Sequence, residues 1–149
     1  MKKINPILTI LLTVLLLGCV NDDCGLCFTP PEPFLFEIVD KTSGENLFTN
    51  GTYNSQEIEI INTSDNSIVE FTFIDENDIN LIQITSIGWQ TEMVNMDVNI
   101  SSNNIFHLFV DAERVAGECC DYTRYNEIRI ENTENEYDSV SGIYKILVE

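Results

Sequence analysis

Basic side chains are scarce in this sequence. Its 149 residues include 7 Lys and Arg against 25 Asp and Glu, which gives a formal net charge of −18 at pH 7. Binding of nucleic acid depends on neutralising phosphates with Lys and Arg, so the composition argues against nucleic acid as a partner. It disfavours direct binding to anionic lipid headgroups for the same reason. The excess of acid favours solubility and resists aggregation.

Catalytic and cofactor motifs are also lacking. The sequence contains no Gly-x-Ser-x-Gly elbow and no His-Glu-x-x-His pair. The single histidine, His107, lies in an alternating run and is expected to face solvent or a neighbouring strand rather than to act in catalysis. Paired carboxylates could serve a glycosidase, but many acids make chance pairs common. We expect no enzyme activity and no cofactor, with a small carboxylate-dependent hydrolase as an alternative.

No apolar run is long enough to cross a membrane. The apolar stretch over residues 7–17 has eleven residues, whereas a spanning helix needs about 20. It follows the basic start Met1-Lys2-Lys3 and ends in Leu16-Leu17-Gly18-Cys19, which is typical of a bacterial lipoprotein signal. We expect cleavage before Cys19, removal of the signal peptide 1–18, and acyl chains such as palmitate on Cys19. Two or more chains would anchor the protein stably on a membrane.

The expected mature chain has a tether and one domain. Loss of Lys2 and Lys3 with the signal peptide would change the net charge from −18 to −20. Residues 19–33 form the lipidated cysteine and a Pro-rich tether, whose Pro30, Pro31 and Pro33 favour extended polyproline geometry. Residues 34–149 are long enough to form one domain with its own core.

Four cysteines remain besides Cys19. They are Cys24, Cys27, Cys119 and Cys120. An even number in an exported chain favours two disulfides. A bond between the adjacent Cys119 and Cys120 would need a strained ring, so either remaining pairing joins the tether to that segment. The alternatives are free or redox-active thiols and a four-thiolate zinc site, although adjacent cysteines lack the usual spacing of zinc ligands.

Short runs of alternating apolar and polar residues fill the chain from Phe34 onward. Period-two alternation with β-branched and aromatic residues predicts half-buried strands. The predicted strands centre on residues 34–39, 57–60, 69–73, 82–84, 94–100, 106–110, 128–130 and 144–148. Turn signals between them include Ser43-Gly44, Asn50-Gly51, Asn103-Asn104 and Ser141-Gly142. We therefore predict an all-β domain, an antiparallel Greek-key sandwich or a small barrel.

Two further features are candidate binding sites. Asp75, Asn77 and Asp78 offer clustered oxygen ligands for calcium, but the segment lacks the Gly and the terminal Glu of an EF-hand loop, so a solvated hairpin tip is the preferred interpretation. Trp89 follows Gly88 directly before a predicted strand, where an amphipathic aromatic ring could bind a protein or a glycan.

The cleavage signal, acidic Asp22-Asp23, Pro-rich tether and single Asn- and Ile-rich β-domain together resemble the small envelope lipoproteins of Bacteroidota. The stretch Phe36–Glu45 also resembles the first hairpin of transthyretin-like and carboxypeptidase-regulatory-like sandwiches, in which a strand ends at Asp before a Gly turn. The first resemblance implies the outer membrane as location and leaves open the periplasmic face or the cell surface. It also implies a glycan on Ser139, because Asp138-Ser139-Val140 is similar to an O-glycosylation motif of that phylum.

The expected function is that of a lipid-anchored, non-enzymatic binding or structural module of the cell envelope. Its partners would be the membrane, through Cys19, and an envelope protein or glycan. A calcium-stabilised surface domain is the alternative that the acidic composition leaves open.

Overall fold

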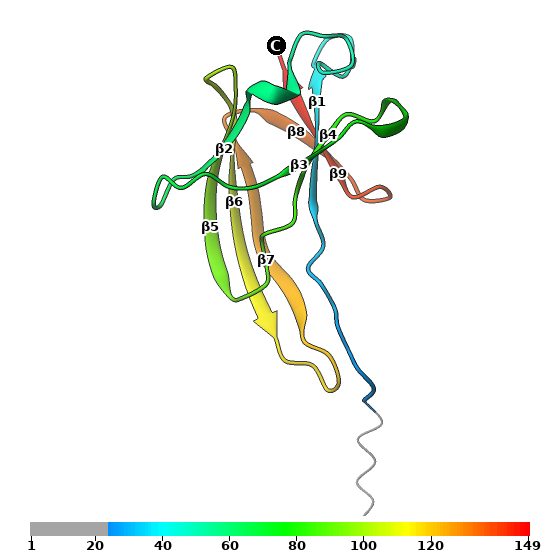
Figure 1. Ribbon diagram of the computed structural model, residues 1–149, viewed down its shortest axis with the longest axis vertical. Coiled ribbons are helices and arrows are strands. Elements are labelled where there is room, and N and C mark those ends of the chain that lie inside the picture. The colour runs from blue at the N-terminus through cyan, green and yellow to red at the C-terminus, as the bar shows by residue number, and fades with distance from the viewer. Residues whose placement is uncertain (1–23) are drawn as a thin grey trace, which may run out of the picture.

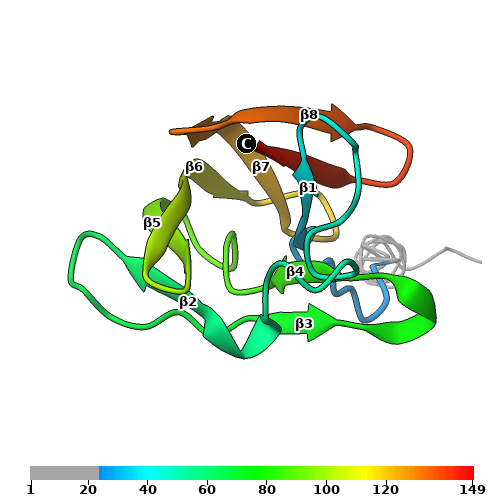
Figure 2. The same cartoon turned by 90° about the horizontal axis from the view of Figure 1, so that it is seen from above.

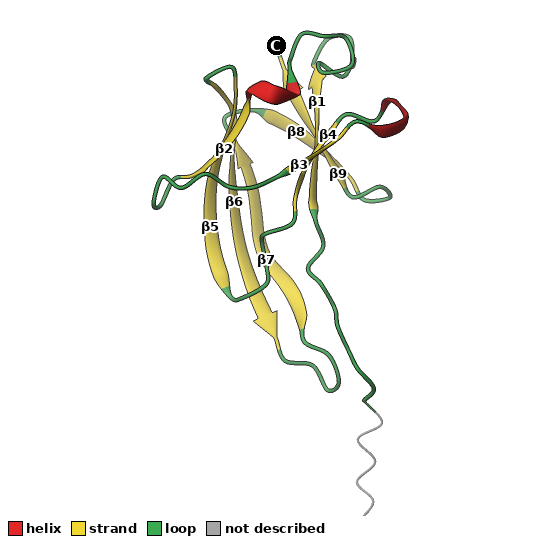
Figure 3. Ribbon diagram, in the orientation of Figure 1, coloured by secondary structure: helices red, strands yellow, loops and turns green. Residues whose placement is uncertain are grey.

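The computed structural model describes residues 24–149. The predicted signal peptide 1–18 and lipidation at Cys19 therefore lie outside the described residues. Within them, no helix has the length and apolar character needed to cross a membrane. Figure 3 shows that this part of the chain consists of strands and loops, with two single 3₁₀ turns at Ser55–Glu57 (η1) and Glu76–Asp78 (η2).

The strands form two sheets that pack face to face, which confirms the predicted all-β sandwich. The first sheet has the order β3-β4-β1-β9-β8 and the second β2-β5-β6-β7. The strands of the first are Thr72–Ile74 (β3), Leu81–Ile84 (β4), Phe34–Asp40 (β1), Ile143–Val148 (β9) and Glu134–Asp138 (β8). Those of the second are Ile58–Asn62 (β2), Glu92–Ile100 (β5), Asn103–Val115 (β6) and Tyr122–Glu131 (β7).

The pairing is antiparallel except at the centre of the first sheet. There β1 runs parallel to β9, with Phe36 opposite Tyr144 and Ile38 opposite Ile146. This pairing joins the start of the domain to the end of the chain. In Figure 2 the first sheet extends from β3 and β4 at the bottom to β8 at the top, and β2, β5 and β6 of the second sheet lie to its left.

The core between the sheets is entirely apolar among the described residues. Phe36 of β1 is fully buried and lies 4.9 Å from Phe106 of β6, measured between ring centroids. Alternate residues of β5, from Val94 to Ile100, are buried, as the period-two pattern predicts. The buried apolar residues that form this core include Phe34, Ile38, Ile60, Ile82, Ile84, Val98, Leu108, Val110 and Ile146.

One strand was missed by the sequence prediction, and one predicted turn was misplaced. β8 was not predicted, because all its residues are exposed and its sequence Glu-Asn-Glu-Tyr-Asp has no apolar alternation. The turn predicted at Asn103-Asn104 lies two residues earlier, at Ser101-Ser102, where both residues have positive φ. That turn is held by Ser101, whose amide donates to the Glu57 carbonyl over 3.1 Å and whose hydroxyl donates to the Glu57 carboxylate.

The turn predicted at Ser43-Gly44 is confirmed. Gly44 has a φ of +74° and donates its amide to the carbonyl of Asp40, where β1 ends. The chain then returns beside β1 through a single bridge between Val39 and Asn46 instead of a full strand. The neighbours of β1 in the sheet are consequently β4 and β9.

The second sheet is longer than the first. In Figure 1, β5, β6 and β7 extend downward past β1 and β9, and the tether runs beside them towards the tip of the β6–β7 hairpin. The start of the described chain and this hairpin tip therefore lie together at one end of the molecule.

Candidate functional site

Two disulfides join the tether to the tip of the β6–β7 hairpin. Cys24 is bonded to Cys119 and Cys27 to Cys120, with Cα–Cα distances of 5.1 and 5.4 Å. The predicted connection between tether and Cys119-Cys120 segment is confirmed, and the pairing that the sequence left open is now assigned. The zinc alternative was wrong, because these sulfur atoms are bonded to one another.

Beyond the disulfides, the tether is held by side chains of the second sheet. Arg114 of β6 donates from Nη2 to the carbonyl of Thr29 over 2.9 Å, and from the same atom to the carbonyl of Asp121 over 3.1 Å. Tyr125 of β7 donates its hydroxyl to the carbonyl of Glu32 over 3.0 Å. Residues 24–33 are thus attached at both ends and in the middle, so they extend the folded domain instead of forming a free linker.

Gly88 lets a loop approach the tether closely. Thr123 of β7 donates its hydroxyl to the Gly88 carbonyl over 2.6 Å. A Cβ at Gly88 would lie 2.8 Å from Thr123 Cγ2, 3.0 Å from the Tyr125 hydroxyl and 3.2 Å from Pro31 Cβ. Its φ of +91° is also a conformation that residues with a Cβ disfavour. Glycine is therefore required here by both backbone conformation and space.

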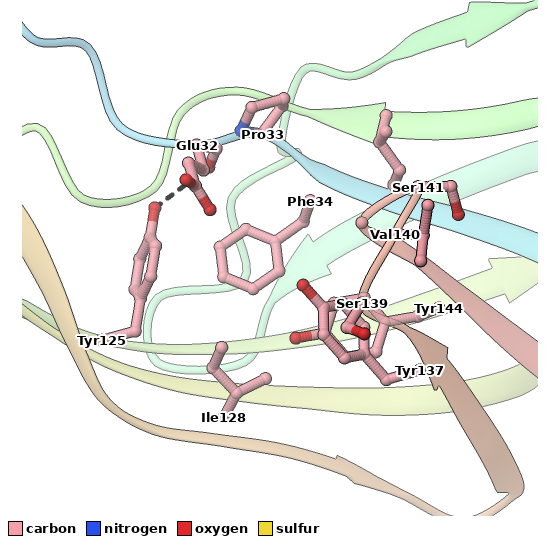
Figure 4. A pocket seen from close by; sticks show the side chains of 12 residues that line it. Glu32, Pro33, Phe34, Tyr125, Ile128, Tyr137, Ser139, Val140, Ser141 and Tyr144 are labelled. Carbon is pink, nitrogen blue, oxygen red and sulfur yellow. Dashed lines mark hydrogen bonds between the residues drawn. The ribbon is translucent and has the colours of Figure 1, made fainter.

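A cleft of about 530 Å³ opens where the tether enters β1; we call it the tyrosine cleft. It lies between β7, the β8–β9 hairpin and the first residues of β1 (Figure 4). Its lining residues are Glu32, Pro33, Phe34, Leu35, Tyr125, Ile128, Tyr137, Ser139, Val140, Ser141, Gly142 and Tyr144. Three segments distant in sequence thus form one aromatic site.

The aromatic rings of the cleft contact one another. Phe34 is buried and packs edge-on against Tyr125 at 5.2 Å, while Tyr137 packs against Tyr144 at 4.5 Å, both between ring centroids. Figure 4 shows the hydroxyl ends of Tyr137 and Tyr144 directed into the cleft. The Tyr125 hydroxyl donates to the Glu32 carbonyl, whereas the hydroxyls of Tyr137 and Tyr144 extend into the cleft. The cleft therefore offers ring surfaces together with hydroxyl groups.

Glu32 sets the charge of the cleft. Of the described residues that line it, Glu32 alone is charged. Burial, followed by the neighbouring carboxylates of Glu32 and Glu92, raises the pKa of Tyr125 to about 12. Burial and, after it, Tyr137 and Glu32 also raise the pKa of Tyr144. The Glu32 carboxylate thus acts on tyrosines of both β7 and β9, which makes the cleft favourable for cations and unfavourable for anions.

Trp89 lies near the disulfides rather than in the tyrosine cleft. Its indole Nε1 donates to the Thr85 carbonyl over 2.8 Å, and its ring centroid lies 5.8 Å from that of Phe28 in the tether. About half of the Trp89 side chain is exposed, at 48%. Its predicted role in a binding surface stays a prediction, but its position is now known.

Exposed apolar side chains gather around the disulfides. Leu26 lies between the two bonded tether cysteines, Phe28 follows Cys27, and Tyr122 lies two residues after Cys120. Leu26 and Phe28 are among the most exposed apolar residues described, and Tyr122 is 43% exposed. Together with Trp89, these residues form what we call the apolar end: Leu26, Phe28, Trp89 and Tyr122. Such a group of exposed apolar side chains is typical of an interaction surface.

His107 faces a neighbouring strand, one of the two positions predicted for it. It lies opposite Asp97 of β5, and its Nδ1 is 2.8 Å from the Asp97 carboxylate. Among the described residues, no hydroxyl or thiol is hydrogen-bonded to His107. The arrangement joins two strands across the outer face of the second sheet.

The predicted calcium ligands lie at the loop between β3 and β4. Asp75 is the N-cap residue of η2, although its side chain makes no capping hydrogen bond, and Asn77 has a φ of 55°. The structure does not describe the side chain of Asp78. Over the described residues, no three His, Cys, Asp or Glu side chains are grouped to hold a metal ion. Calcium binding at this loop stays a prediction without support from the geometry.

Ser139 lies at the rim of the tyrosine cleft. It is exposed at the turn between β8 and β9, where Asp138 accepts from the Val140 amide over 2.9 Å and the Ser141 hydroxyl over 2.7 Å. These bonds hold the turn and leave the Ser139 side chain at the surface. Its glycosylation stays a prediction, and a glycan here would stand at the entrance to the cleft.

Compared with known proteins, the chain matches no family model, no curated protein and no solved structure.

Proposed function

We propose that this chain is an exported lipoprotein, cleaved before Cys19, that serves as a non-enzymatic binding module of the cell envelope. The outer membrane is the proposed location, and an envelope protein or glycan is the proposed partner. The observation that carries the proposal is the pair of disulfides from the tether to the β6–β7 hairpin. Disulfides persist in oxidising compartments and are rare in the cytosol.

The disulfides also define how an anchored domain would sit. Five residues lead from Cys19 to Cys24, and at about 3.5 Å each they reach at most about 18 Å. Because Cys24 is bonded to Cys119 at a Cα–Cα distance of 5.1 Å, Cys119 at the hairpin tip would stay within about 23 Å of the lipidated cysteine. The short tether and its disulfides would therefore hold the β6–β7 end of the sandwich close to the membrane.

The apolar end supports this orientation. Leu26 and Phe28 follow Cys19 by seven and nine residues and are exposed next to the disulfides. Trp and Tyr are enriched where proteins meet the membrane–water interface. Trp89 and Tyr122 occur at this same end, so the surface nearest the proposed lipid has the composition that an interface favours.

Anchoring is tested by replacing the lipidated thiol. We expect the wild-type chain to incorporate an alkyne-tagged palmitate analogue in cells and to sediment with membranes. A Cys19→Ala variant should lose both properties. The double variant Cys24→Ala/Cys119→Ala is the matched control, because it removes cysteines but keeps Cys19. Labelling of the Cys19→Ala variant at the wild-type level would contradict the proposal.

The partner is sought by crosslinking in intact cells, followed by purification and mass spectrometry. One protein recovered in near-equal amount, and lost with Cys19→Ala, would establish a protein-binding module. Recovery of the same proteins with both chains would argue against a role that depends on anchoring.

A further inference from the structure

The tyrosine cleft combines features that select for one kind of ligand. Its walls are the rings of Tyr125, Tyr137 and Tyr144, and its single charged lining residue among those described is Glu32. Aromatic faces attract cations through their quadrupole, and the attraction grows when the cation is partly desolvated. A carboxylate at the edge adds an ion pair to the same ligand.

The net negative charge of the whole chain also favours a cationic ligand. The net charge is −18, and no Lys or Arg is present among the described lining residues of the cleft. A field of one sign raises the local concentration of ligands of opposite charge and increases their association rate. An anionic or neutral partner gains nothing from this field.

We propose that the tyrosine cleft binds an arginine side chain of a basic partner protein. This inference rests on the proposed function, because it supplies the chemistry by which the envelope module recognises a protein partner. The guanidinium group stacks flat on a tyrosine ring, while its N–H groups donate to the Glu32 carboxylate and to tyrosine hydroxyl oxygens.

Arginine fits these groups better than lysine or a sugar. Its planar guanidinium stacks on aromatic faces and carries five donors in a rigid fork, whereas the lysine ammonium is a strongly hydrated point charge. The hydroxyls of Tyr137 and Tyr144 extend into the cleft, where their oxygens can accept such donors. A neutral sugar could donate hydrogen bonds to the Glu32 carboxylate but would bring no positive charge to it or to the tyrosine rings.

The position of the cleft leaves it accessible in an anchored protein. The β8–β9 hairpin forms one wall of the cleft, whereas the disulfides lie at the tip of the β6–β7 hairpin (Figure 1). A domain that stands on its disulfide end would thus present the tyrosine cleft to the side, away from the membrane.

The test compares two peptides that differ only in charge. Acetyl-glycyl-arginyl-glycinamide is titrated into the purified full chain with both disulfides formed, and the citrulline peptide serves as its neutral isostere. Binding is followed by the chemical shifts of the tyrosine ring protons. We expect the arginine peptide to bind about tenfold more tightly than the citrulline peptide, and the lysine peptide to lie between them.

Variants of cleft residues, compared with variants outside the cleft, test whether the arginine peptide binds in the tyrosine cleft. Tyr137→Leu keeps apolar volume at an exposed position, and Glu32→Gln removes the carboxylate charge; each should weaken arginine binding about threefold or more. The matched controls are Tyr122→Leu, an exposed tyrosine outside the cleft, and Glu70→Gln, an exposed acid outside it. Both should bind as the wild type does.

Equal affinity for the arginine and citrulline peptides would overturn the proposal. So would equal weakening by the cleft variants and their controls, which would indicate general attraction to an acidic surface. Because the titration uses purified protein and no membrane, a failure of Cys19 anchoring leaves its result intact. Loss of peptide binding would likewise leave the anchor unaffected.

Discussion

Cys27 is bonded to Cys120 although the two residues are separated by 93 positions in the sequence, and Cys24 is bonded to Cys119 directly beside it. The two bonds therefore cross along the sequence, because Cys27 lies inside the loop closed by Cys24 and Cys119 while Cys120 lies outside it. Once either has formed, the other closes a ring of only six residues, namely 24–27 together with Cys119 and Cys120. This relationship has consequences for stability that a single disulfide would not have.

Removing the disulfides should destabilise the domain in a strongly non-additive way. In the chain-entropy model, closing the long loop contributes about 4.7 kcal/mol and closing a six-residue ring about 2 kcal/mol. Either double variant, Cys24→Ser/Cys119→Ser or Cys27→Ser/Cys120→Ser, should thus lower the free energy of unfolding by about 2 kcal/mol, and the four-serine variant by about 7 kcal/mol. Urea denaturation of the three variants measures this; a four-serine loss equal to the sum of the two doubles would contradict it.

Alanine should destabilise the domain more at Gly88 than at Gly142. Both residues have positive φ, but a Cβ at Gly88 would press on Thr123, Tyr125 and Pro31, whereas none of these obstructions exists at Gly142. Gly142→Ala should cost about 1–2 kcal/mol of backbone strain. Gly88→Ala should cost about 1–3 kcal/mol more, because overpacking displaces the tether from β7.

The readout for this pair is the free energy of unfolding together with hydrogen exchange of the β7 amides. Only Gly88→Ala should accelerate exchange near Tyr125, since the loop and tether pack there. Equal losses of stability in the two alanine variants would show that the close approach of the tether contributes nothing.

The strands that were predicted from sequence and the strand that was missed differ in burial. In β5, the residues Val94, Met96, Val98 and Ile100 face the core and alternate with polar ones, so local pattern was sufficient. β8 is an edge strand with both faces exposed, so its sequence had no reason to alternate. Its charged residues instead match the way edge strands resist pairing with other chains.

The tyrosine cleft could not be predicted from the sequence for a different reason. Tyr125 comes from β7, Tyr137 and Tyr144 from the β8–β9 hairpin, and Glu32 from the tether. They meet because β9 pairs in parallel with β1 and because Tyr125 binds the Glu32 carbonyl. Both contacts join segments about a hundred residues apart, which no local pattern records. The connection between the tether and the β6–β7 hairpin could be predicted, because cysteines in an exported chain indicate disulfides however far apart they lie in the sequence.

Alkaline pH should destabilise the domain through Tyr125. Its pKa is raised from 10.0 to about 12 in the folded chain, so between these values the unfolded chain loses the phenolic proton and the folded chain retains it. Fewer protons on the unfolded state make stability fall as pH rises. The stabilisation from this group is complete below pH 10 and is lost as the pH rises towards about 12.

The variant that isolates this effect is Tyr125→Phe. It loses the hydrogen bond to the Glu32 carbonyl, so it should be less stable than the wild type at neutral pH. Its stability should nevertheless fall less steeply between pH 10 and 12. Tyr122→Phe, outside the cleft, should keep the wild-type slope. Parallel alkaline profiles for the wild type and Tyr125→Phe would rule out Tyr125 as the source.

Trp89 should report directly on the proposed membrane contact, because it is the single tryptophan of the chain and lies at the apolar end. With the lipidated full chain in phosphatidylcholine vesicles, we expect its emission to shift to the blue and to be quenched by lipids brominated near the headgroup. The reason is that indole rings favour the interface, and the disulfides keep Trp89 and Phe28 near the proposed anchor. The Cys19→Ala chain added to the same vesicles should show neither change. Vesicle-bound protein whose Trp89 emission is unaffected by brominated lipid would mean that the domain is held off the surface and that the apolar end serves another partner.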